Sequence, residues 1–121
     1  MSRIDVNKTY KLFIGGAFPR SESGRVYEVK NAKGQFIANP ALASRKDLRD
    51  AVVASRAAFG KWSGSSAYLR GQILYRIAEM LEGRSEQFET ELKAIGDKTK
   101  LSEAVDLIVW YAGWTDKLSA L

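Results

Sequence analysis

The periodicity of the apolar residues changes once along this chain, at Ser44, and this change most constrains the fold. Before Ser44, short apolar or alternating runs are separated by turn residues, a pattern typical of β-strands. After it, apolar residues recur every three or four positions, which predicts helices. We therefore expect an α+β arrangement, with a β-hairpin or meander in residues 1–40 and three or four helices in residues 44–121.

Three short runs within residues 1–40 are predicted strands. They are Tyr10–Ile14, Arg25–Lys30 and Gln35–Ala38, each with β-branched or aromatic residues. Turn-forming residues separate the runs. Pro40 limits the third run, because proline cannot donate a hydrogen bond to a sheet ladder. A sheet this small is not stable by itself, so we expect it to pack on another element.

The first predicted helix begins after Ser44. Ser44 and Asp47 have the spacing of a capping box, with aspartate in place of the usual glutamate. Gly60 is the expected C-cap of this helix. Residues 60–67 are mostly small and polar, apart from Trp62, and we expect them to form a linker.

Two further helical segments are predicted after the linker. The first opens near Ala67 and reaches Gly83, a residue that either breaks or bends the helix. Ser85 is the expected cap of a short segment that Gly96 closes.

The last helical segment, which begins near Thr99 or Ser102, is apolar nearly all round. Its centre, residues 107–111, has the sequence Leu-Ile-Val-Trp-Tyr and contains no charged side chain. We expect such a helix to be buried on more than one side. Three amphipathic helices and a small sheet offer a thin core for this much apolar surface. We therefore expect another chain, or further residues of the same protein, to cover it.

The chain of 121 residues contains no cysteine and no histidine. This composition excludes thiol nucleophiles, disulfides, zinc sites built from Cys and His, and Ser-His-Asp or Cys-His catalysis. It also removes the side chain that most often transfers protons near neutral pH. No apolar run is long enough to cross a bilayer, and no segment near the N-terminus has the pattern of a signal peptide. We therefore expect a cytoplasmic location and no membrane partner.

The net charge of +5 is concentrated in the first half of the chain. Residues 1–60 carry 11 Lys and Arg against 5 Asp and Glu, whereas residues 61–121 carry 8 against 9. A basic half could bind an anionic partner such as nucleic acid. The basic residues are scattered without aromatic interleaving, however, which favours an ordinary solvated surface.

Several patterns resemble chemical sites, and a structural interpretation is favoured for each. Gly15-Gly16 lacks the spacing of a phosphate-binding loop and predicts a hairpin turn. The Tyr68–Tyr75 segment has Gln72 where a Tyr-x-x-x-Lys arrangement needs lysine. Four carboxylates without a histidine partner are expected to lie on a solvated face: Glu82, Glu86, Glu89 and Glu91. The sequence thus predicts no catalytic, cofactor-binding or metal-binding residue.

An aromatic group in the last helical segment is the one candidate site that remains. Trp110, Tyr111 and Trp114 could stack on nucleic-acid bases. Their helical spacing and their Val and Ile neighbours favour packing in a core or an interface instead. We therefore predict that these three residues form an interface.

Four segments of the chain, taken in order, resemble the opening of the NAD(P)-dependent aldehyde dehydrogenase superfamily. The segments are Lys11–Phe18, Ala43–Trp62, Arg70–Glu82 and Val109–Leu118. They are similar to that family's initial strand and Gly turn, its first helix with a closing Ala-Phe-x-x-Trp, its R-x-x-x-L-x-x-x-A-x-x-L helix and its "yyAgwadkl" helix. The resemblance covers essentially the whole chain.

Two details depart from the family pattern and suggest a divergent branch. The turn Asn31-Ala32-Lys33-Gly34 lacks the proline of the usual Asn-Pro-Ala-Thr-Gly turn. The Gly-Lys pair before the last helix is present only as Gly96-Asp97-Lys98.

The resemblance implies that this chain is the N-terminal part of a Rossmann-like cofactor domain. Members of the family oxidise an aldehyde to a carboxylic acid with NAD or NADP. Their catalytic Cys, Glu base, oxyanion Asn and cofactor loop all lie beyond the matched segments, so no family functional residue falls on this chain. The implied cofactor, NAD or NADP, would therefore not be bound by this chain alone.

Three hypotheses about function follow. The first is a structural, incomplete segment, residues 1–121, of an aldehyde dehydrogenase-like oxidoreductase. The second is a stand-alone interaction or scaffold protein that self-associates or docks on a full-length homologue. Nucleic-acid binding is a weaker third. Whether the reading frame continues past Leu121 distinguishes the first hypothesis from the second.

Overall fold

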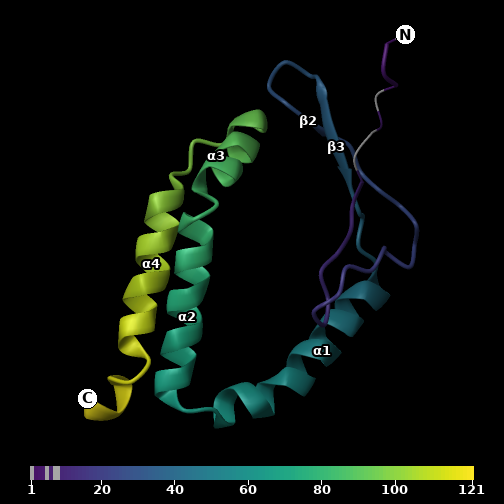
Figure 1. Cartoon of the computed structure of the whole chain (residues 1–121). Helices are drawn as coiled ribbons and strands as arrows, with labels where there is room; N and C mark the ends of the chain where they lie inside the picture. Colours follow the sequence, from purple (N-terminus) through teal and green to yellow (C-terminus); the bar gives the residue numbers. More distant parts are fainter. Residues whose placement is uncertain (1, 5, 7–8) are drawn as a thin grey trace. The chain divides into compact units, whose positions relative to one another are not determined.

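The computed structural model describes residues 2–4, 6 and 9–121 (Figure 1). The α+β class predicted from the sequence is confirmed, because a small three-stranded sheet precedes four α-helices in the described residues. Two compact units are present, Met1–Phe59 and Gly60–Leu121, and the division between them falls within the first helix. The elements in order are β1 (Thr9–Tyr10), β2 (Val29–Lys30), β3 (Phe36–Pro40), α1 (Arg45–Gly64), α2 (Ala67–Glu82), α3 (Ser85–Ala94), α4 (Leu101–Trp114) and the 3₁₀ turn η1 (Leu118–Ala120).

The sheet has the order β1-β3-β2. The expected hairpin is formed by β2 and β3, which pair antiparallel across a turn closed by Gly34, whose φ is +77°. β1 pairs parallel to β3, so β3 and not β2 is the central strand, which differs from a simple meander. The backbone N–H of Ala41 donates to the carbonyl of Tyr10 at 2.9 Å, and this bond fixes the parallel pairing.

The two outer strands are shorter than the sequence predicts. Only Tyr10 of the Tyr10–Ile14 run lies in β1, and only the last two residues of the Arg25–Lys30 run lie in β2. Val26 forms an isolated bridge with Ala41 instead. β3 ends at Pro40, as the missing N–H of proline predicts.

The capping box at the start of α1 is confirmed. The Ser44 N–H donates to Asp47 Oδ2 at 2.8 Å, and the Asp47 N–H donates to Ser44 Oγ at 3.3 Å. The predicted C-cap at Gly60 is wrong, because α1 continues to Gly64. Gly60 does not adopt the left-handed conformation that ends many helices, so the chain stays helical there.

The linker after α1 is correspondingly short and consists of Ser65 and Ser66. Ser66 is the N-cap of α2, and its hydroxyl accepts a hydrogen bond from the Leu69 N–H at 3.1 Å. The Arg70 guanidinium donates to the carbonyls of Ser63, at 3.3 Å, and Ser65. These bonds satisfy backbone groups that the ends of α1 and α2 leave unpaired.

Gly83 breaks the helical path between α2 and α3. α2 ends at Glu82 and α3 begins at Ser85. The predicted cap at Ser85 is wrong, because Arg84 holds the N-cap position and makes no capping bond through its side chain. Gly96 ends α3 as predicted: its φ is +77°, and its N–H donates to the Lys93 carbonyl at 3.0 Å.

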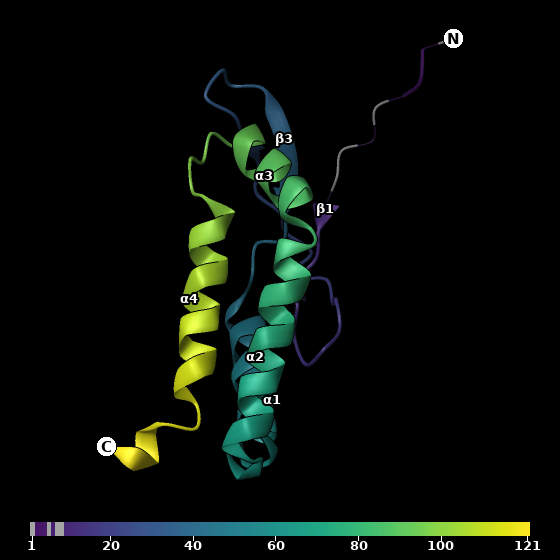
Figure 2. The same cartoon turned by 60° about the vertical axis from the view of Figure 1, so that its left-hand side comes forward.

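Within the second unit, α2 and α4 lie side by side and run in opposite directions, and both views show this pairing (Figures 1 and 2). The two helices contribute four buried residues, Gly71 and Ala78 of α2 and Leu101 and Ala112 of α4. α3 also contacts α4. Among the described residues, no helix combines the length and the apolarity needed to span a bilayer.

Candidate functional site

The strongest candidate site is the face of α4 that points away from α2. Four residues at the spacing i, i+3, i+4 and i+7 share this surface, which we call the aromatic face: Leu107, Trp110, Tyr111 and Trp114. Leu107, Trp110 and Tyr111 are 56%, 57% and 56% exposed, and Trp114 is half-buried. The expectation that α4 is buried on more than one side, with another chain or further residues covering the second side, stays a prediction, because this chain alone leaves the aromatic face exposed. Within the second unit α4 contacts α2 and α3, and the aromatic face stays exposed beside both contacts.

The aromatic side chains of this face contact one another. The rings of Trp110 and Tyr111 meet edge to face, with centroids 5.0 Å apart and an interplanar angle of 87°. Trp110 and Trp114 lie 5.8 Å apart at 54°. Such arrangements add to the stability that the rings gain from burial, and they restrict the rotamers of exposed side chains. The three residues predicted to form an interface thus form one contiguous aromatic group.

The opposite side of α4 fixes the direction in which the aromatic face points. Gly71 of α2 lies against the C-terminal end of α4, with no room for a side chain. A Cβ atom at Gly71 would lie 2.6 Å from Thr115 Oγ1 and 3.2 Å from the carbonyl of Ala112. Thr115 Oγ1 also donates to that carbonyl at 3.0 Å, so moving the hydroxyl away would break this hydrogen bond. The sequence analysis did not single out Gly71, although an isolated glycine in a helical pattern is a signal for close packing.

The Gly15-Gly16 pair forms a hairpin turn, as predicted. Gly15 and Gly16 have φ values of +62° and +79°, and the backbone groups of Ile14 and Ala17 exchange two hydrogen bonds of 3.0 and 3.1 Å. Positive φ at both central residues is typical of a two-residue β-hairpin and needs glycine or asparagine. Gly15 and Gly16 are therefore the two central residues of a tight hairpin turn, which is the structural interpretation that the sequence favoured.

A buried carboxylate joins two distant parts of the first unit. Asp47 is only 6% exposed and accepts hydrogen bonds from Ser21 Oγ at 2.6 Å, from the Ser44 N–H at 2.8 Å and from the Glu22 N–H at 3.2 Å. These donors, the Ser21 hydroxyl first, lower the pKa of Asp47 from 3.8 to about 2. The contact with Ser21 was not anticipated from the sequence. Both carboxylate oxygens of Asp47 accept hydrogen bonds from backbone N–H groups. Asp47 therefore has the contacts of a residue that stabilises the fold.

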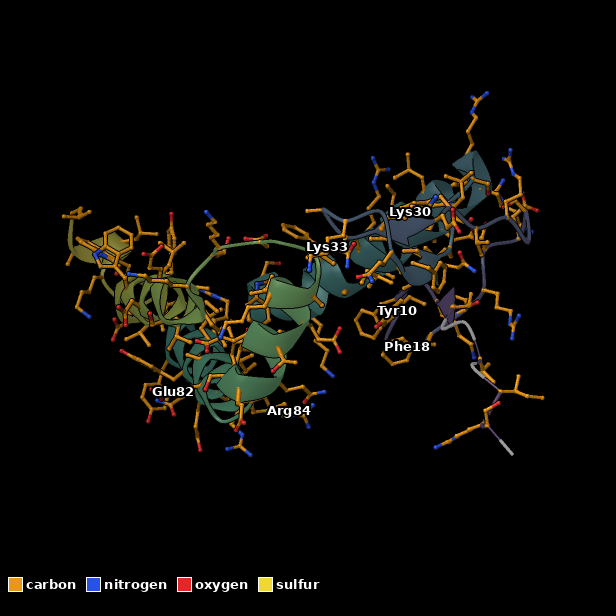
Figure 3. The ribbon with its side chains drawn as sticks, turned by 90° about the horizontal axis from the view of Figure 1, so that it is seen from above. Tyr10, Phe18, Lys30, Lys33, Glu82 and Arg84 are labelled. Atoms are coloured by element: carbon orange, nitrogen blue, oxygen red, sulfur yellow. The ribbon has the colours of Figure 1, made fainter. Side chains whose placement is uncertain are left out.

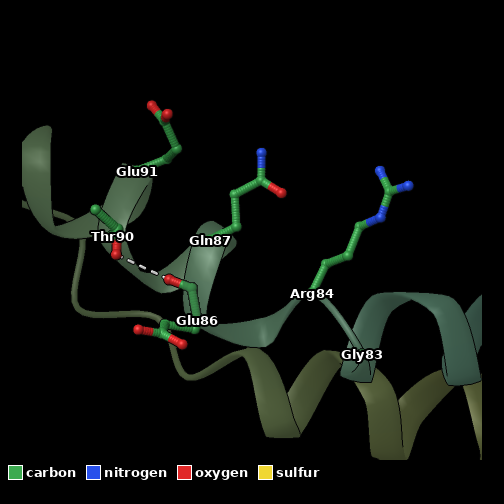
Figure 4. A pocket seen from close by; sticks show the side chains of 6 residues that line it. All are labelled: Gly83, Arg84, Glu86, Gln87, Thr90 and Glu91. Carbon is green, nitrogen blue, oxygen red and sulfur yellow. Dashed lines mark hydrogen bonds between the residues drawn. The ribbon is translucent and has the colours of Figure 1, made fainter.

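The four carboxylates of residues 82–91 do not gather into a site in the described structure. Glu82 and Arg84 point outward from the helices in Figure 3. Figure 4 shows an open depression at the α2–α3 junction, where Arg84, Gln87 and Glu91 project to one side of α3. Thr90 Oγ1 donates to the Glu86 carbonyl at 2.8 Å within the helix. No three His, Cys, Asp or Glu residues of the described part are placed to hold a metal ion.

The arrangement of sheet and helices, together with the sequence, assigns the chain to a family. The model of the aldehyde dehydrogenase family matches residues 18–120, and the chain belongs to that family. It is 34% identical over 119 residues to a cytosolic 10-formyltetrahydrofolate dehydrogenase from Pongo abelii, covering 90% of this chain and 13% of the relative. It is 40% identical over 103 residues to the 2-hydroxymuconic semialdehyde dehydrogenase of Pseudomonas sp. (strain CF600), covering 83% and 21%.

Solved structures of the family have the same backbone arrangement. The NAD-dependent benzaldehyde dehydrogenase from Corynebacterium glutamicum superposes with a TM-score of 0.83 at 26% identity, covering 89% of this chain and 25% of that protein. An aldehyde dehydrogenase variant from Bacillus cereus gives 0.80 at 26% identity, covering 97% and 28%. The chain thus has the fold of an aldehyde dehydrogenase N-terminal segment and spans about a quarter of these solved relatives.

Proposed function

We propose that residues 1–121 are a structural, non-catalytic segment of an aldehyde dehydrogenase that oxidises an aldehyde to a carboxylic acid with NAD or NADP. Membership of the family supports the reaction class. One solved relative is described as NAD-dependent, and another, PnpE, was crystallised with nicotinamide adenine dinucleotide. The thiol nucleophile of such a reaction would lie outside this segment, because the sequence contains no cysteine.

The observation that carries this proposal is the large surface that the chain leaves exposed. Its accessible area is 10079 Å² for a mass of 13.5 kDa. Two separate compact units of half that mass would together expose about 7,800 Å². The excess of about 2,300 Å² equals what one partner buries in a large obligate interface. The segment therefore has the surface of a piece that other residues cover.

The character of the exposed surface supports the same conclusion. No side chain in the described residues is less than 2% exposed, and the buried apolar residues of that part are Ala38, Ala78, Leu101 and Ala112. Large apolar side chains are exposed in both units, for example Phe59 at 68% and Trp110 at 57%. An ordinary domain of this length buries its larger apolar side chains. We infer that residues 1–121 are one incomplete domain that further residues complete.

The proposal is tested by assaying the isolated chain with a panel of aldehydes, benzaldehyde among them, and either NAD or NADP. The absorbance of the reduced nicotinamide is followed, and we expect no rise above that of the buffer. The Corynebacterium glutamicum benzaldehyde dehydrogenase serves as the positive control. Cofactor-dependent turnover by the isolated chain would overturn the non-catalytic role.

A further inference from the structure

We infer that a small pocket of the first unit, which Lys11, Arg20 and Arg25 line, binds a phosphate group, either as inorganic phosphate or as a phosphate monoester. The pocket has a volume of about 50 Å³ and lies between β1, the loop of residues 20–26 and Ala41. The inference is independent of the proposed function, because it concerns a ligand of this segment alone.

The fold brings together basic residues that the sequence spaces apart. Lys11, Arg20 and Arg25 look like scattered surface charges in the sequence, yet all three line one pocket. No Asp or Glu is among the described residues that line it. Three like charges around one small space repel one another, and a bound anion reverses that repulsion.

The three basic side chains have no competing partner. Within the part of the chain that the structure describes, the side chains of Lys11, Arg20 and Arg25 form no ion pair and no hydrogen bond. Other basic side chains of that part do pair with a neighbouring carboxylate: Lys30, Arg49, Arg76 and Lys117. The donors at the pocket are therefore available to a ligand.

Two acidic residues adjoin the pocket through Ser21, and both are engaged elsewhere. Glu22 follows Ser21 in the chain, and Asp47 accepts a hydrogen bond from the Ser21 hydroxyl at 2.6 Å. Ser44, at the start of α1, donates through its hydroxyl to Glu22 Oε1 at 3.2 Å and through its N–H to Asp47 Oδ2 at 2.8 Å. These two carboxylates therefore contact the start of α1 and do not line the pocket.

Backbone hydrogen bonds hold the walls of the pocket in place. The Leu12 N–H donates to the Pro19 carbonyl at 3.0 Å, which joins the segments that carry the first two basic residues. The Leu42 N–H donates to the Arg25 carbonyl at 2.8 Å, and the Arg25 N–H donates to Ser23 Oγ at 3.2 Å. Because the backbone is already ordered, an anion has to order only side chains when it binds.

The size and the charge of the pocket favour a phosphate group over other anions. A water molecule needs about 10–15 Å³ of such space, so a volume of about 50 Å³ holds roughly three to five heavy atoms. A phosphate group has that size, whereas a nucleoside base is larger. Guanidinium groups bind phosphate oxygens in a bidentate manner, and a lysine adds a point charge. Three cations also favour a dianion over a monoanion such as acetate.

The test is a titration of the full 121-residue chain with inorganic phosphate, followed by the amide signals in NMR spectra at constant ionic strength. We expect saturable shifts at Lys11, Arg20 and Arg25, and none at Ala78 in the second unit. Adenosine monophosphate replaces inorganic phosphate in a second titration, and adenosine in a third. Equal affinity for the first two ligands is expected if the phosphate group alone is recognised, and a tighter fit of either one identifies the free ion or the monoester as the preferred source.

Substitutions at the pocket measure what the guanidinium groups contribute. Arg20→Gln and Arg25→Gln should each raise the dissociation constant for phosphate about tenfold, the effect of losing one hydrogen bond to a charged group. Arg56→Gln is the matched control, because it removes the same charge from an exposed position on α1 outside the pocket. We expect it to change the dissociation constant less than about 2-fold. Unchanged amide dispersion shows that each variant keeps the fold.

Several results would overturn the inference. Shifts that do not saturate, or that acetate produces equally at the same ionic strength, would show general screening of charge. An effect of Arg56→Gln as large as that of Arg20→Gln would assign the binding to net charge and not to the pocket. Binding of adenosine at the same amides would exclude the phosphate group as the recognised part. Duplex DNA that binds without loss of affinity in the Arg20 and Arg25 variants, while inorganic phosphate does not bind, would replace the pocket with a diffuse basic surface.

Discussion

Asp47 shows how much of the first unit depends on one side chain. Its carboxylate accepts a hydrogen bond from the helix start at Ser44 and two from the loop at Ser21 and Glu22. Ser21 Oγ is also within 2.8 Å of Ser23 Oγ, and Ser23 Oγ donates to the Leu42 carbonyl at 3.2 Å. A helix cap and a loop 26 residues away are thus held by the same carboxylate.

The ionisation of Asp47 predicts how acid affects this contact. Because the pKa in the folded chain is about 2 and the ordinary value is 3.8, the ionised carboxylate stabilises the fold above about pH 4. That stabilisation declines as the pH falls from 4 and is lost below about pH 2. The carboxyl carbon of Asp47, followed by NMR, should titrate near pH 2, and the Ser44 and Glu22 amide signals should shift with it. Asp47→Asn should abolish these amide shifts, whereas a midpoint near 3.8 would contradict the network.

Two glycines of the helices predict opposite responses to a methyl group. Gly71→Ala places its Cβ 2.6 Å from Thr115 Oγ1 and 3.2 Å from a backbone carbonyl, and should lower the free energy of unfolding by about 1–3 kcal/mol.

Gly60 lies inside α1 with no other atom within 4 Å of the added Cβ. Gly60→Ala should therefore raise helix stability by about 0.5–1 kcal/mol. Urea titration of the helical circular dichroism measures both, and a stabilising Gly71→Ala would refute the close approach.

At the level of elements, the junction between α1 and α2 depends on local hydrogen bonds. α1 runs through Gly60 and ends at Gly64, and α2 begins after only two further residues. The Ser66 hydroxyl caps the new helix, while the Arg70 side chain bonds to the last carbonyls of the preceding one. The Ser66 hydroxyl and the Arg70 guanidinium therefore replace helical hydrogen bonds that the break removes.

This junction predicts a specific effect of removing the cap. Ser66→Ala should destabilise α2 by about 0.5–2 kcal/mol, because the Leu69 N–H loses its acceptor. Ser66→Asp should retain most of the stability, since aspartate caps helices as well as serine does. Ser63→Ala, which removes only a 3.4 Å bond within α1, is the matched control. Thermal melting followed by circular dichroism separates the three variants, and equal melting of Ser66→Ala and Ser63→Ala would count against the cap.

On the scale of the whole molecule, the exposed apolar surface determines behaviour in solution. Contiguous apolar patches of several hundred Å² are rare on free monomers and mark interaction sites. Apolar residues are exposed in both units: on the aromatic face of α4, and in a groove of the first unit lined by Phe13, the Gly15-Gly16 turn and small residues of α1 such as Ala54. The molecule is thus expected to be stable only when a partner covers these surfaces.

The isolated chain should accordingly bind a hydrophobic dye such as anilinonaphthalene sulfonate. We expect dye fluorescence in buffer well above that of an intact family member at the same concentration, because apolar side chains such as Phe59 and Trp110 are exposed. Fluorescence no higher than that of the intact enzyme would contradict the exposed surface described here.

The local features of the fold could be predicted, because they depend on neighbours in the sequence. The capping box at Ser44, the hairpin turn at Gly15-Gly16 and the end of α3 at Gly96 each involve residues within a few positions. The prediction that the first helix ends at Gly60 is wrong. A glycine of this kind ends a helix when it adopts a left-handed conformation, and Gly60 does not adopt it. The prediction that Ser85 caps α3 is also wrong, because the break at Gly83–Arg84 places the N-cap at Arg84.

The amino-acid sequence by itself determined the class of fold, the family and the absence of cysteine and histidine chemistry. Periodicity, turn residues and composition are properties of short segments. Only the tertiary structure decided that β1 joins β3 in parallel, that Ser21 bonds to Asp47, and that α4 buries one side against α2 and exposes the aromatic face. These features join residues roughly 26 to 44 positions apart, as in the pairs Ser21–Asp47 and Gly71–Thr115. Their formation depends on the packing of whole elements, which no short segment specifies.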